Sequence, residues 1–248
     1  MTIEERQDIE NRLLLGLISV DKLPVNLYEN WYNELSSEVD NQFDEDSDDY
    51  DDYFYYIDSV KTNISKFSSA KVFKFISTLM VLIDLKKQGQ ISGADYSTQA
   101  NNLWNMYDSI YLNTEKEDII NTVTNSKTWF EITNFGMSDP MLEYCTQRDD
   151  KVRKLHRLYD GIVKRSSDLF WIENYPPNGD NCRCYVKVVK INETNRDIDT
   201  SETSAPFKLN SALVGKIWND SGKNMHNYFE VDKKYYTFRS KNFGLPLK

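Results

Sequence analysis

The chain has 248 residues and a formal net charge of −9 at pH 7, with 39 acidic residues against 30 basic ones. This balance excludes a protein whose surface is basic throughout, as in many nucleic-acid-binding domains. Any DNA contact therefore needs a local cluster of Lys and Arg. Aromatic residues make up 13% of the sequence, which is typical of a folded protein rather than a disordered tail. The length suits one large domain or two small ones.

No apolar stretch is long enough for a membrane span. The closest, residues 72–85, is too short and contains Lys74 and Asp84. The charged N-terminal segment lacks the layout of a signal peptide, so we expect no membrane contact and a protein that is made and kept in a cytoplasm. Three cysteines are an odd number, and Cys182 and Cys184 are too close in sequence to pair without strain, so no disulfide framework is expected.

The N-terminal end of the chain predicts two helices. Residues 2–36 have apolar positions at helical spacing, and Pro24 separates a first helix from a second. Thr2 and Glu5 have the spacing of a capping box, which marks the start of the first helix. Its buried face is expected to comprise Ile9, Leu13, Leu14 and Leu17.

Residues 38–58 combine many acidic side chains with aromatic ones. Like charges at this density repel one another in a compact structure, so we expect a solvated linker. The alternative is an acidic clamp for a basic partner surface, or a mimic of nucleic acid that shields such a surface, because aromatic side chains could anchor the tract on a protein. The aromatic residues concerned are Tyr50, Tyr53, Phe54, Tyr55 and Tyr56.

Three further helices are predicted in the first half of the chain. Residues 60–87 are apolar on most of a helical surface, and helices over about 92–112 and 115–128 follow. The first half is therefore expected to be an all-helical unit. The middle of these three helices is expected to bury Leu103, Trp104, Met106, Tyr107 and Ile110.

The pattern changes after Trp129. Residues 159–163 predict a turn followed by a strand, residues 168–181 a loop, and residues 182–191 a strand with β-branched alternation. The expected fold class is α+β, with an N-terminal helical unit followed by a small domain that has a short antiparallel sheet.

His156, Cys182 and Cys184 are the best candidates for metal ligands. Alternation along a strand places both cysteine sulfurs on one face, and a histidine from a nearby helix could join them. Cys145 or His226 could complete a tetrahedral zinc site. Structural zinc sites favour Cys-x-x-Cys spacing, however, and that spacing is missing. We therefore expect no cofactor and a buried core with a hydrogen-bonded histidine, with zinc as the alternative.

Catalysis is not expected, because a Cys–His nucleophile needs a third orienting group and an oxyanion site. Arg148, Arg153 and Arg183 are expected to hold a loop through neighbouring Asp residues, or to form a solvated ion-pair surface. The main basic concentration is a candidate surface for DNA phosphates, or for the acidic tract of a neighbouring subunit. It comprises Lys151, Arg153, Lys154, Arg157, Lys164 and Arg165.

The order of short motifs between residues 148 and 184 is more specific than any one of them. Arg-x-x-His is followed by Asp-Gly, a Trp, Pro-Pro-Asn-Gly and Cys-Arg-Cys. The residues are Arg153, His156, Asp160, Gly161, Trp171, Pro176, Pro177, Asn178, Gly179, Cys182, Arg183 and Cys184. A weaker second element consists of Phe207, Asn210, His226, Tyr228 and Phe229.

With these motifs the chain resembles the Mu F-like family of tailed bacteriophages, also called minor head or head morphogenesis proteins. The resemblance covers about residues 129–230. Many relatives have a Pro where this chain has Asn227. The resemblance divides the chain into a helical unit over 1–128, a Mu F-like domain over 129–230 and an extended tail over 231–248.

The resemblance implies a structural protein without enzymatic turnover. Its expected role is phage head, or procapsid, assembly near the portal vertex, and its expected location is the virion head. The implied partners are the portal protein, the major capsid or scaffold protein, and phage DNA. Two alternatives remain open, namely an effector or toxin that carries a Mu F-like domain and a DNA-binding accessory protein.

Overall fold

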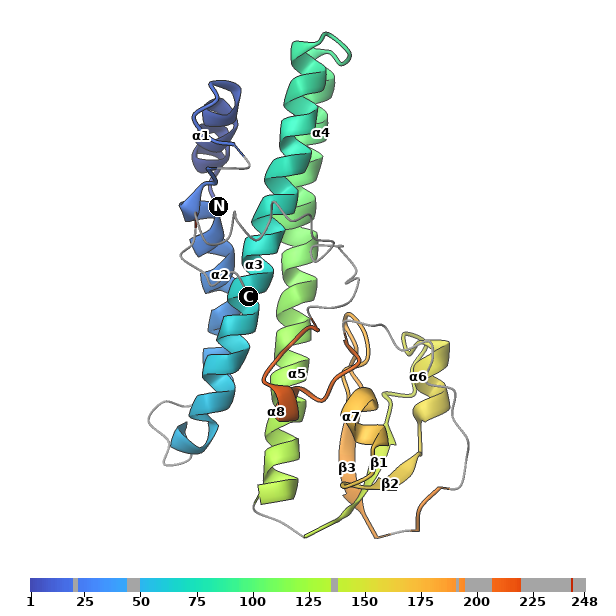
Figure 1. Ribbon diagram of the computed structural model, residues 1–248. Coiled ribbons are helices and arrows are strands. Elements are labelled where there is room, and N and C mark those ends of the chain that lie inside the picture. Colours follow the sequence, from blue (N-terminus) through green and yellow to red (C-terminus); the bar gives the residue numbers. More distant parts are fainter. Residues whose placement is uncertain are drawn as a thin grey trace. The chain divides into compact units, whose positions relative to one another are not determined.

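The structure, a computed structural model, describes residues 1–19, 22–43, 50–134, 138–190, 192–194, 207–219 and 242. It has long helices in its first half and a three-stranded antiparallel sheet in its second (Figure 1), so the predicted α+β class is confirmed. The chain divides into two compact units. Unit 1 comprises Met1–Ser36, Ile64–Asn113 and Tyr228–Lys248, and unit 2 comprises Ser37–Asn63 and Thr114–Asn227.

Each unit therefore combines segments that are far apart in the sequence. The domains predicted from the sequence are consecutive instead, and their limits at 1–128, 129–230 and 231–248 stay a prediction. Among the described residues, no helix is both long enough and apolar enough to span a membrane.

Helix α1 (Ile3–Leu14) opens unit 1 and begins with the predicted capping box of Thr2 and Glu5. Ile9 and Leu13 are buried as expected, but Leu17 is 53% exposed. The prediction for Leu17 is wrong because the helix ends at Leu14, and Gly16 turns the chain with a φ of +70°. Helix α2 (Val25–Asp40) follows Pro24.

Helix α3 (Tyr50–Lys87) begins inside the acidic tract, so the expectation of a solvated linker is wrong for residues 50–58. Tyr53, Tyr56 and Ile57 face the interior, whereas the flanking acidic residues Asp51, Asp52 and Asp58 are exposed. This spacing lets a helix bury its aromatic side chains and keep its like charges in water. Residues 44–49 of the tract lie outside the described residues.

The two tyrosines pack within unit 2 rather than serving as exposed anchors. Tyr53 and Tyr56 lie against Phe43 and Phe130, with ring centroids 5.2 to 6.3 Å apart. Tyr55, by contrast, is 84% exposed.

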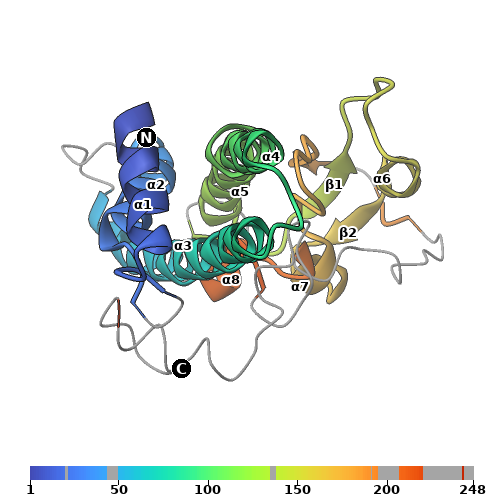
Figure 2. The ribbon, with the colours of Figure 1, turned by 90° about the horizontal axis from the view of Figure 1, so that it is seen from above.

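A turn with Gly89 at a φ of +72° ends α3, and the chain returns as α4 (Gly93–Asn105). Figure 1 and Figure 2 both show the C-terminal part of α3 beside α4, running in the opposite direction. Phe75 of α3 and Trp104 of α4 pack with ring centroids 4.3 Å apart, at the centre of unit 1.

A π-helical turn, η1 (Met106–Ile110), joins α4 to α5 (Tyr111–Asn134). Leu103, Trp104 and Tyr107 are buried as predicted, but Met106 is 38% and Ile110 55% exposed. Those two predictions are wrong because a π turn bonds residues five apart, which shifts the following side chains away from regular α spacing.

The sheet of unit 2 has the order β2-β1-β3, with β1 (Met141–Cys145) in the middle. β2 (Val163–Arg165) and β3 (Tyr185–Val189) both pair antiparallel to it. β3 is shorter than the predicted strand over 182–191, because the last residue of β1, Cys145, pairs with Tyr185 and leaves the preceding residues without a ladder partner.

Unit 2 also contains short helices, and α6 lies beside β1 and β2 in both ribbon views (Figure 1, Figure 2). They are α6 (Lys154–Tyr159), α7 (Phe170–Asn174) and α8 (Ser211–Val214). The segment 168–181, predicted as a loop, thus contains the short helix α7. The core between helices and sheet includes Trp129, Leu142, Tyr144, Tyr159, Trp171, Tyr175 and Val186.

Asn63 of α3 fixes the segment 207–219 within unit 2. Its Oδ1 accepts hydrogen bonds from the backbone N–H groups of Ile217 (3.0 Å) and Trp218 (3.1 Å), and its Nδ2 donates to the Trp218 carbonyl (3.1 Å). The segment contains two residues of the weaker sequence element. Phe207 is buried, and Asn210 caps α8 by accepting the Ala212 N–H at 3.1 Å.

Candidate functional site

The structure brings His156, Cys182 and Cys184 together in the interior of unit 2. His156 lies in α6, and the two cysteines lie in the extended segment before β3. The Nδ1 atom of His156 is 3.4 Å from the sulfur of Cys182 and 3.6 Å from that of Cys184. All three side chains are buried, and their potential ligand atoms lie within 4.8 Å of one another.

The Arg-x-x-His and Pro-Pro-Asn-Gly motifs are neighbours in space. Arg153 is the N-cap of α6, and its guanidinium donates to the backbone carbonyl of Asp180. A Cβ atom at Gly179 would lie 3.2 Å from the Arg153 Nη1 atom, so a side chain there would have to displace the guanidinium. The two motifs thus fix the start of the helix that carries His156.

The Asp-Gly motif joins the end of α6 to β1. Asp160 accepts hydrogen bonds from the N–H (2.8 Å) and the hydroxyl (3.1 Å) of Thr146, and Arg148 donates to its other oxygen at 2.9 Å. Burial opposes ionisation of Asp160, but these bonds outweigh burial and lower its pKa. Gly161 follows with a φ of +78°, which suits glycine, and its N–H donates to the Tyr144 carbonyl.

Trp171 and the Pro-Pro-Asn-Gly loop close the core under the site. Trp171 is fully buried, and its indole N–H donates to the Arg165 carbonyl at 2.9 Å. Pro176 and Pro177 are buried in the same loop. Asn178 then donates to the Tyr144 hydroxyl at 2.9 Å, which fixes the loop against β1.

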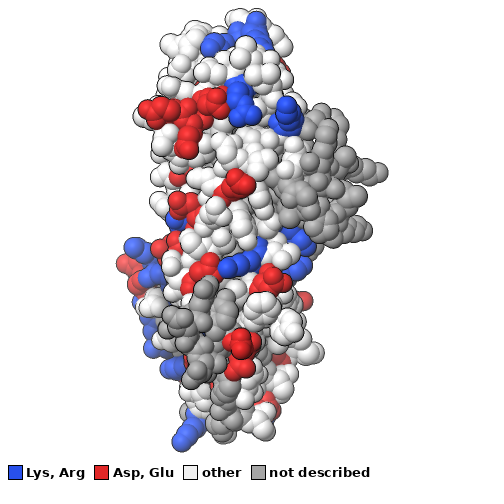
Figure 3. All heavy atoms as spheres, turned by 90° about the vertical axis from the view of Figure 1, so that its left-hand side faces the viewer, with Lys and Arg blue, Asp and Glu red and all other residues white. Residues whose placement is uncertain are grey.

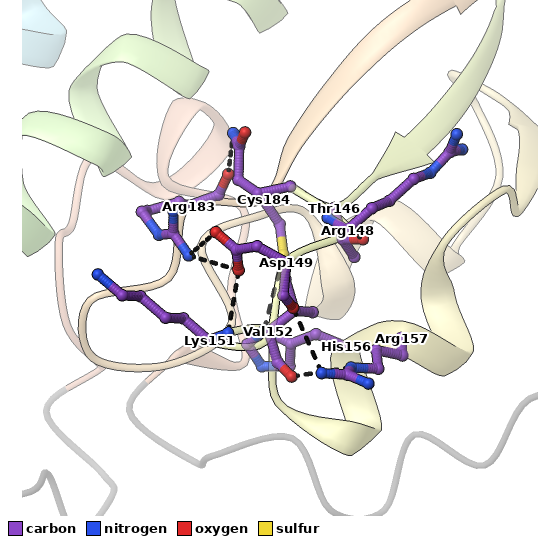
Figure 4. A network of polar contacts seen from close by, with 10 residues as sticks. Thr146, Arg148, Asp149, Lys151, Val152, His156, Arg157, Arg183 and Cys184 are labelled. Atoms are coloured by element: carbon purple, nitrogen blue, oxygen red, sulfur yellow. Dashed lines mark hydrogen bonds and ion pairs between the residues drawn. The ribbon is translucent and has the colours of Figure 1, made fainter.

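Arg183 holds the loop in front of the cluster. Its Nη2 atom lies 2.8 and 2.9 Å from the two carboxylate oxygens of Asp149, and Figure 4 shows this pair beside His156 and Cys184. The hydrogen bond with Arg183 lowers the pKa of Asp149. Arg157 donates to the carbonyls of Val152 and Asp149, so it too braces the loop.

The predicted basic concentration is largely engaged in contacts within the chain. Besides Arg153 and Arg157, Lys164 lies 3.8 Å from Asp168. Arg165 lies 3.5 Å from Asp139 and 3.4 Å from Glu193. Acidic partners within the chain therefore reduce the positive field that DNA phosphates would meet.

The pKa values of the two cysteines are shifted in opposite directions. A hydrogen bond from Cys184 holds the pKa of the Cys182 thiol well below its usual value, and His156 adds to the effect against the opposing effect of burial. The hydrogen bond to Cys182, together with burial, raises the pKa of Cys184. A cavity of about 20 Å³ adjoins the cluster, which is room for about one water molecule.

The other two predicted ligands are not part of the cluster that the structure describes. Cys145 is buried at the end of β1, and its sulfur lies 3.6 Å from the backbone carbonyl of Glu143. His226 lies outside the described residues, as do Tyr228 and Phe229 of the weaker element.

A polar stripe on α5 supports the site, and the sequence analysis missed it. Asp118 accepts the N–H of Asn181 at 2.6 Å, and Asn125 donates to the carbonyl of Cys184 at 3.2 Å. The signal was present as polar residues at helical spacing on a face that is otherwise apolar. The buried members of the stripe are Glu115, Asp118, Thr122, Asn125 and Ser126.

Two carboxyl groups meet at the end of this stripe. Burial raises the pKa of Asp118 well above its usual value, and the negative charge of Asp180 raises it further. Burial raises the pKa of Asp180 as well. At least one of the pair is therefore disposed to keep its proton where an exposed aspartate would lose it.

Comparison with known proteins identifies a related region. Residues 85–187 match the family model described as Phage Mu protein F like protein. The putative capsid assembly protein F of Escherichia phage Mu is 38% identical over 50 residues, which are 20% of this chain and 11% of that protein. The Mu-like prophage FluMu F protein of Haemophilus influenzae is 29% identical over 85 residues, which are 34% of this chain and 20% of that protein. No solved structure matches the chain.

The matched region extends from the end of α3 into β3 and contains both the polar stripe of α5 and the cluster around His156. It begins and ends earlier than the resemblance found at residues 129–230, and it includes α5, which contributes buried polar contacts to the motifs. The matches span at most a fifth of the length of the curated relatives. Through residues 85–187, this chain is therefore similar to the proteins of the Phage Mu protein F like family.

Proposed function

We propose that this protein acts in the assembly of a bacteriophage head by binding other head proteins. The observation that carries the proposal is the family match over residues 85–187, together with a relative in phage Mu that is named a putative capsid assembly protein.

The contacts around His156 support binding rather than catalysis. The motif side chains of Arg153, Asp160 and Asn178 are engaged in holding loops and helix ends within the chain. The cavity next to the cysteines has a volume of about 20 Å³, far below the several hundred Å³ of a typical ligand pocket. A small space of this kind suits a structural centre.

The finer part of the proposal concerns place and partners. We propose a minor component of the virion head near the portal vertex that contacts the portal protein and the major capsid or scaffold protein. Contact with phage DNA is secondary, because the net charge is −9 and much of the basic concentration is paired. Figure 3 shows blue and red side chains interspersed over the described part of one face. Binding to DNA should therefore be weak and should fall steeply with salt.

The test is the isolation of procapsids and virions from the phage that encodes the chain, followed by mass spectrometry with copy counting. Wild-type chain and an Ile172→Ala variant should both sediment with procapsids, because Ile172 is 47% exposed. The neighbouring Trp171→Ala variant should be lost from them, because Trp171 is fully buried in the matched region. Co-sedimentation should persist at salt concentrations that abolish DNA binding.

Absence of the chain from procapsids and virions alike would refute the assembly role. A gene located beside an immunity-like partner, rather than beside portal and terminase genes, would then favour the effector or toxin alternative. DNA binding that outlasts procapsid binding as salt increases would favour the DNA-binding accessory protein.

A further inference from the structure

We propose that unit 2 holds a zinc ion bound by the Nδ1 atom of His156 and the sulfurs of Cys182 and Cys184. The site goes beyond the assembly role and does not depend on it. Such an ion would join α6 to the segment before β3, two parts of the chain that no strand pairing connects in the structure as described.

The two distances from the His156 nitrogen to the cysteine sulfurs fit a tetrahedral ion. Zinc lies about 2.3 Å from a thiolate sulfur and about 2.0 to 2.1 Å from an imidazole nitrogen, so a tetrahedral site has a sulfur-to-nitrogen edge of about 3.5 to 3.6 Å. The two edges from His156 Nδ1 measure 3.4 and 3.6 Å. Both sulfurs thus occupy positions suited to a common ion.

A hydrogen bond alone accounts less well for this arrangement. The Nδ1 atom has one in-plane direction in which it can donate or accept. Here it lies almost equally far from two sulfurs, and one hydrogen bond of this atom can serve only one of them. A metal ion accepts the nitrogen and both sulfurs at once.

The surroundings also suit the ion. Two thiolates and Zn²⁺ form a centre without net charge, which reduces the cost of burying it. Tyr144, which hydrogen-bonds to Cys184, is in turn held by Asn178 at 2.9 Å, so one ligand has a fixed neighbour. Ordered partners of this kind orient the ligands of protein metal sites.

The fourth ligand position of the tetrahedral zinc ion would face a space that can hold one water molecule. His156, Cys182 and Cys184 all line the cavity of about 20 Å³. Lys151, Arg153, Asn181 and Arg183 border both this cavity and a wider surface pocket of about 340 Å³. The ligands therefore have a route to solvent along which an ion can arrive, and a water molecule completes the tetrahedron.

The test uses the full chain, produced and purified under reducing conditions without chelators. Elemental analysis should find about one zinc ion per chain. Replacement of zinc by Co²⁺ should produce thiolate-to-cobalt charge-transfer absorption and the strong visible bands of a tetrahedral ion. Cys182 and Cys184 should resist alkylation until a strong chelator is added.

The chain offers a matched control for the loss of one buried thiol. Cys182→Ser, Cys184→Ser and His156→Gln should each lower the bound zinc to background. Cys145→Ser should retain it, because Cys145 is equally buried in unit 2 but lies outside the cluster.

Zinc-free wild-type chain that also fails to produce the cobalt absorption would overturn the proposal, as would equal loss of zinc from Cys145→Ser. Unprotected thiols in the zinc-loaded wild-type chain would also overturn it. Where a ligand variant does not fold, the spectrum of cobalt-loaded wild-type chain decides.

Discussion

Single polar side chains hold the loops around His156, where regular strands are short. Asp160 satisfies donors from Thr146 and Arg148, and Asn178 reaches the hydroxyl of Tyr144. An Asn or Asp side chain can replace a backbone partner in this way, and it fixes a loop with one or two hydrogen bonds. The motif residues that are most specific in sequence are therefore those with the most defined partners.

Trp171 should contribute more to stability than any exposed neighbour. Truncation of a fully buried Trp leaves a cavity, so Trp171→Ala should lower the free energy of unfolding of unit 2 by about 3–5 kcal/mol. Ile172→Ala, next to it on α7 and 47% exposed, should change it by less than about 0.5 kcal/mol. Denaturant titration followed by circular dichroism compares the two, and equal midpoints would contradict the assigned burial.

At the scale of elements, helices provide polar anchors for chain segments that have no regular pairing. The stripe on α5 binds the loop that contains Asn181 and Cys184. Asn63 on α3 does the same for residues 217–218. Buried amides and carboxyls thus determine which helix face receives which loop, whereas apolar contacts alone would allow several positions.

The Asn63 anchor can be removed by one substitution. Asn63→Ala leaves two buried N–H groups and one carbonyl without their partner, at a cost of about 1–3 kcal/mol for each unsatisfied group. We expect the segment 207–219 to lose protection before the sheet does. Hydrogen exchange followed by mass spectrometry can resolve this difference.

Asn63→Asp is the matched variant, because its protonated carboxyl keeps an oxygen acceptor for both N–H groups and an O–H donor for the Trp218 carbonyl. It should therefore protect the segment better than Asn63→Ala does, at a pH at which the introduced carboxyl is neutral. Unchanged exchange at residues 207–219 in the alanine variant would show that the anchor is dispensable.

For the whole molecule, the pair of Asp118 and Asp180 predicts how stability depends on pH. A group with a raised pKa in the folded state stabilises the fold fully below its unfolded-state pKa, and this contribution is lost as pH rises through the folded-state pKa. The stability of unit 2 should therefore decrease through the loss of this contribution as pH rises from mildly acidic values. Asp118→Asn keeps the acceptor for the Asn181 N–H and should raise the melting temperature more at high pH than at low pH.

Asp160→Asn provides the control of opposite sign. The pKa of Asp160 is lowered in the folded state, so its contribution is present above the unfolded-state pKa and is lost as pH falls. Its replacement should cost stability mainly at neutral pH. Melting curves across pH would refute the assignment of Asp118 if both variants showed the same trend.

The sequence predicted the class of the fold and several local features, because these depend on nearby residues. The capping box at Thr2, the long helix over residues 60–87 and the turn at Gly161 are of this kind. The meeting of His156 with the two cysteines was also predicted as a candidate site. The helix from Tyr50 was not predicted, because the dense acidic charge of this segment indicates a solvated linker, whereas the spacing of its aromatic residues indicates a helix.

The π turn at Met106–Ile110 and the pairing of Asp118 with Asp180 were out of reach for a different reason. Each depends on contacts between residues distant in the chain. Asp108 in the π turn accepts hydrogen bonds from Trp31 at 2.8 Å and Arg6 at 2.6 Å. The sequence around residue 108 has no local pattern that predicts those partners.

The anchor at Asn63 also has a consequence for the timing of folding during synthesis. A ribosome produces Asn63 long before Trp218, and domains fold as units once their parts are available. The buried amide of Asn63 must therefore wait for more than half of the chain before its three backbone partners exist. Nascent chains stalled before residue 207 should remain sensitive to protease at the segment around residue 63, and chaperones have that interval in which to bind it.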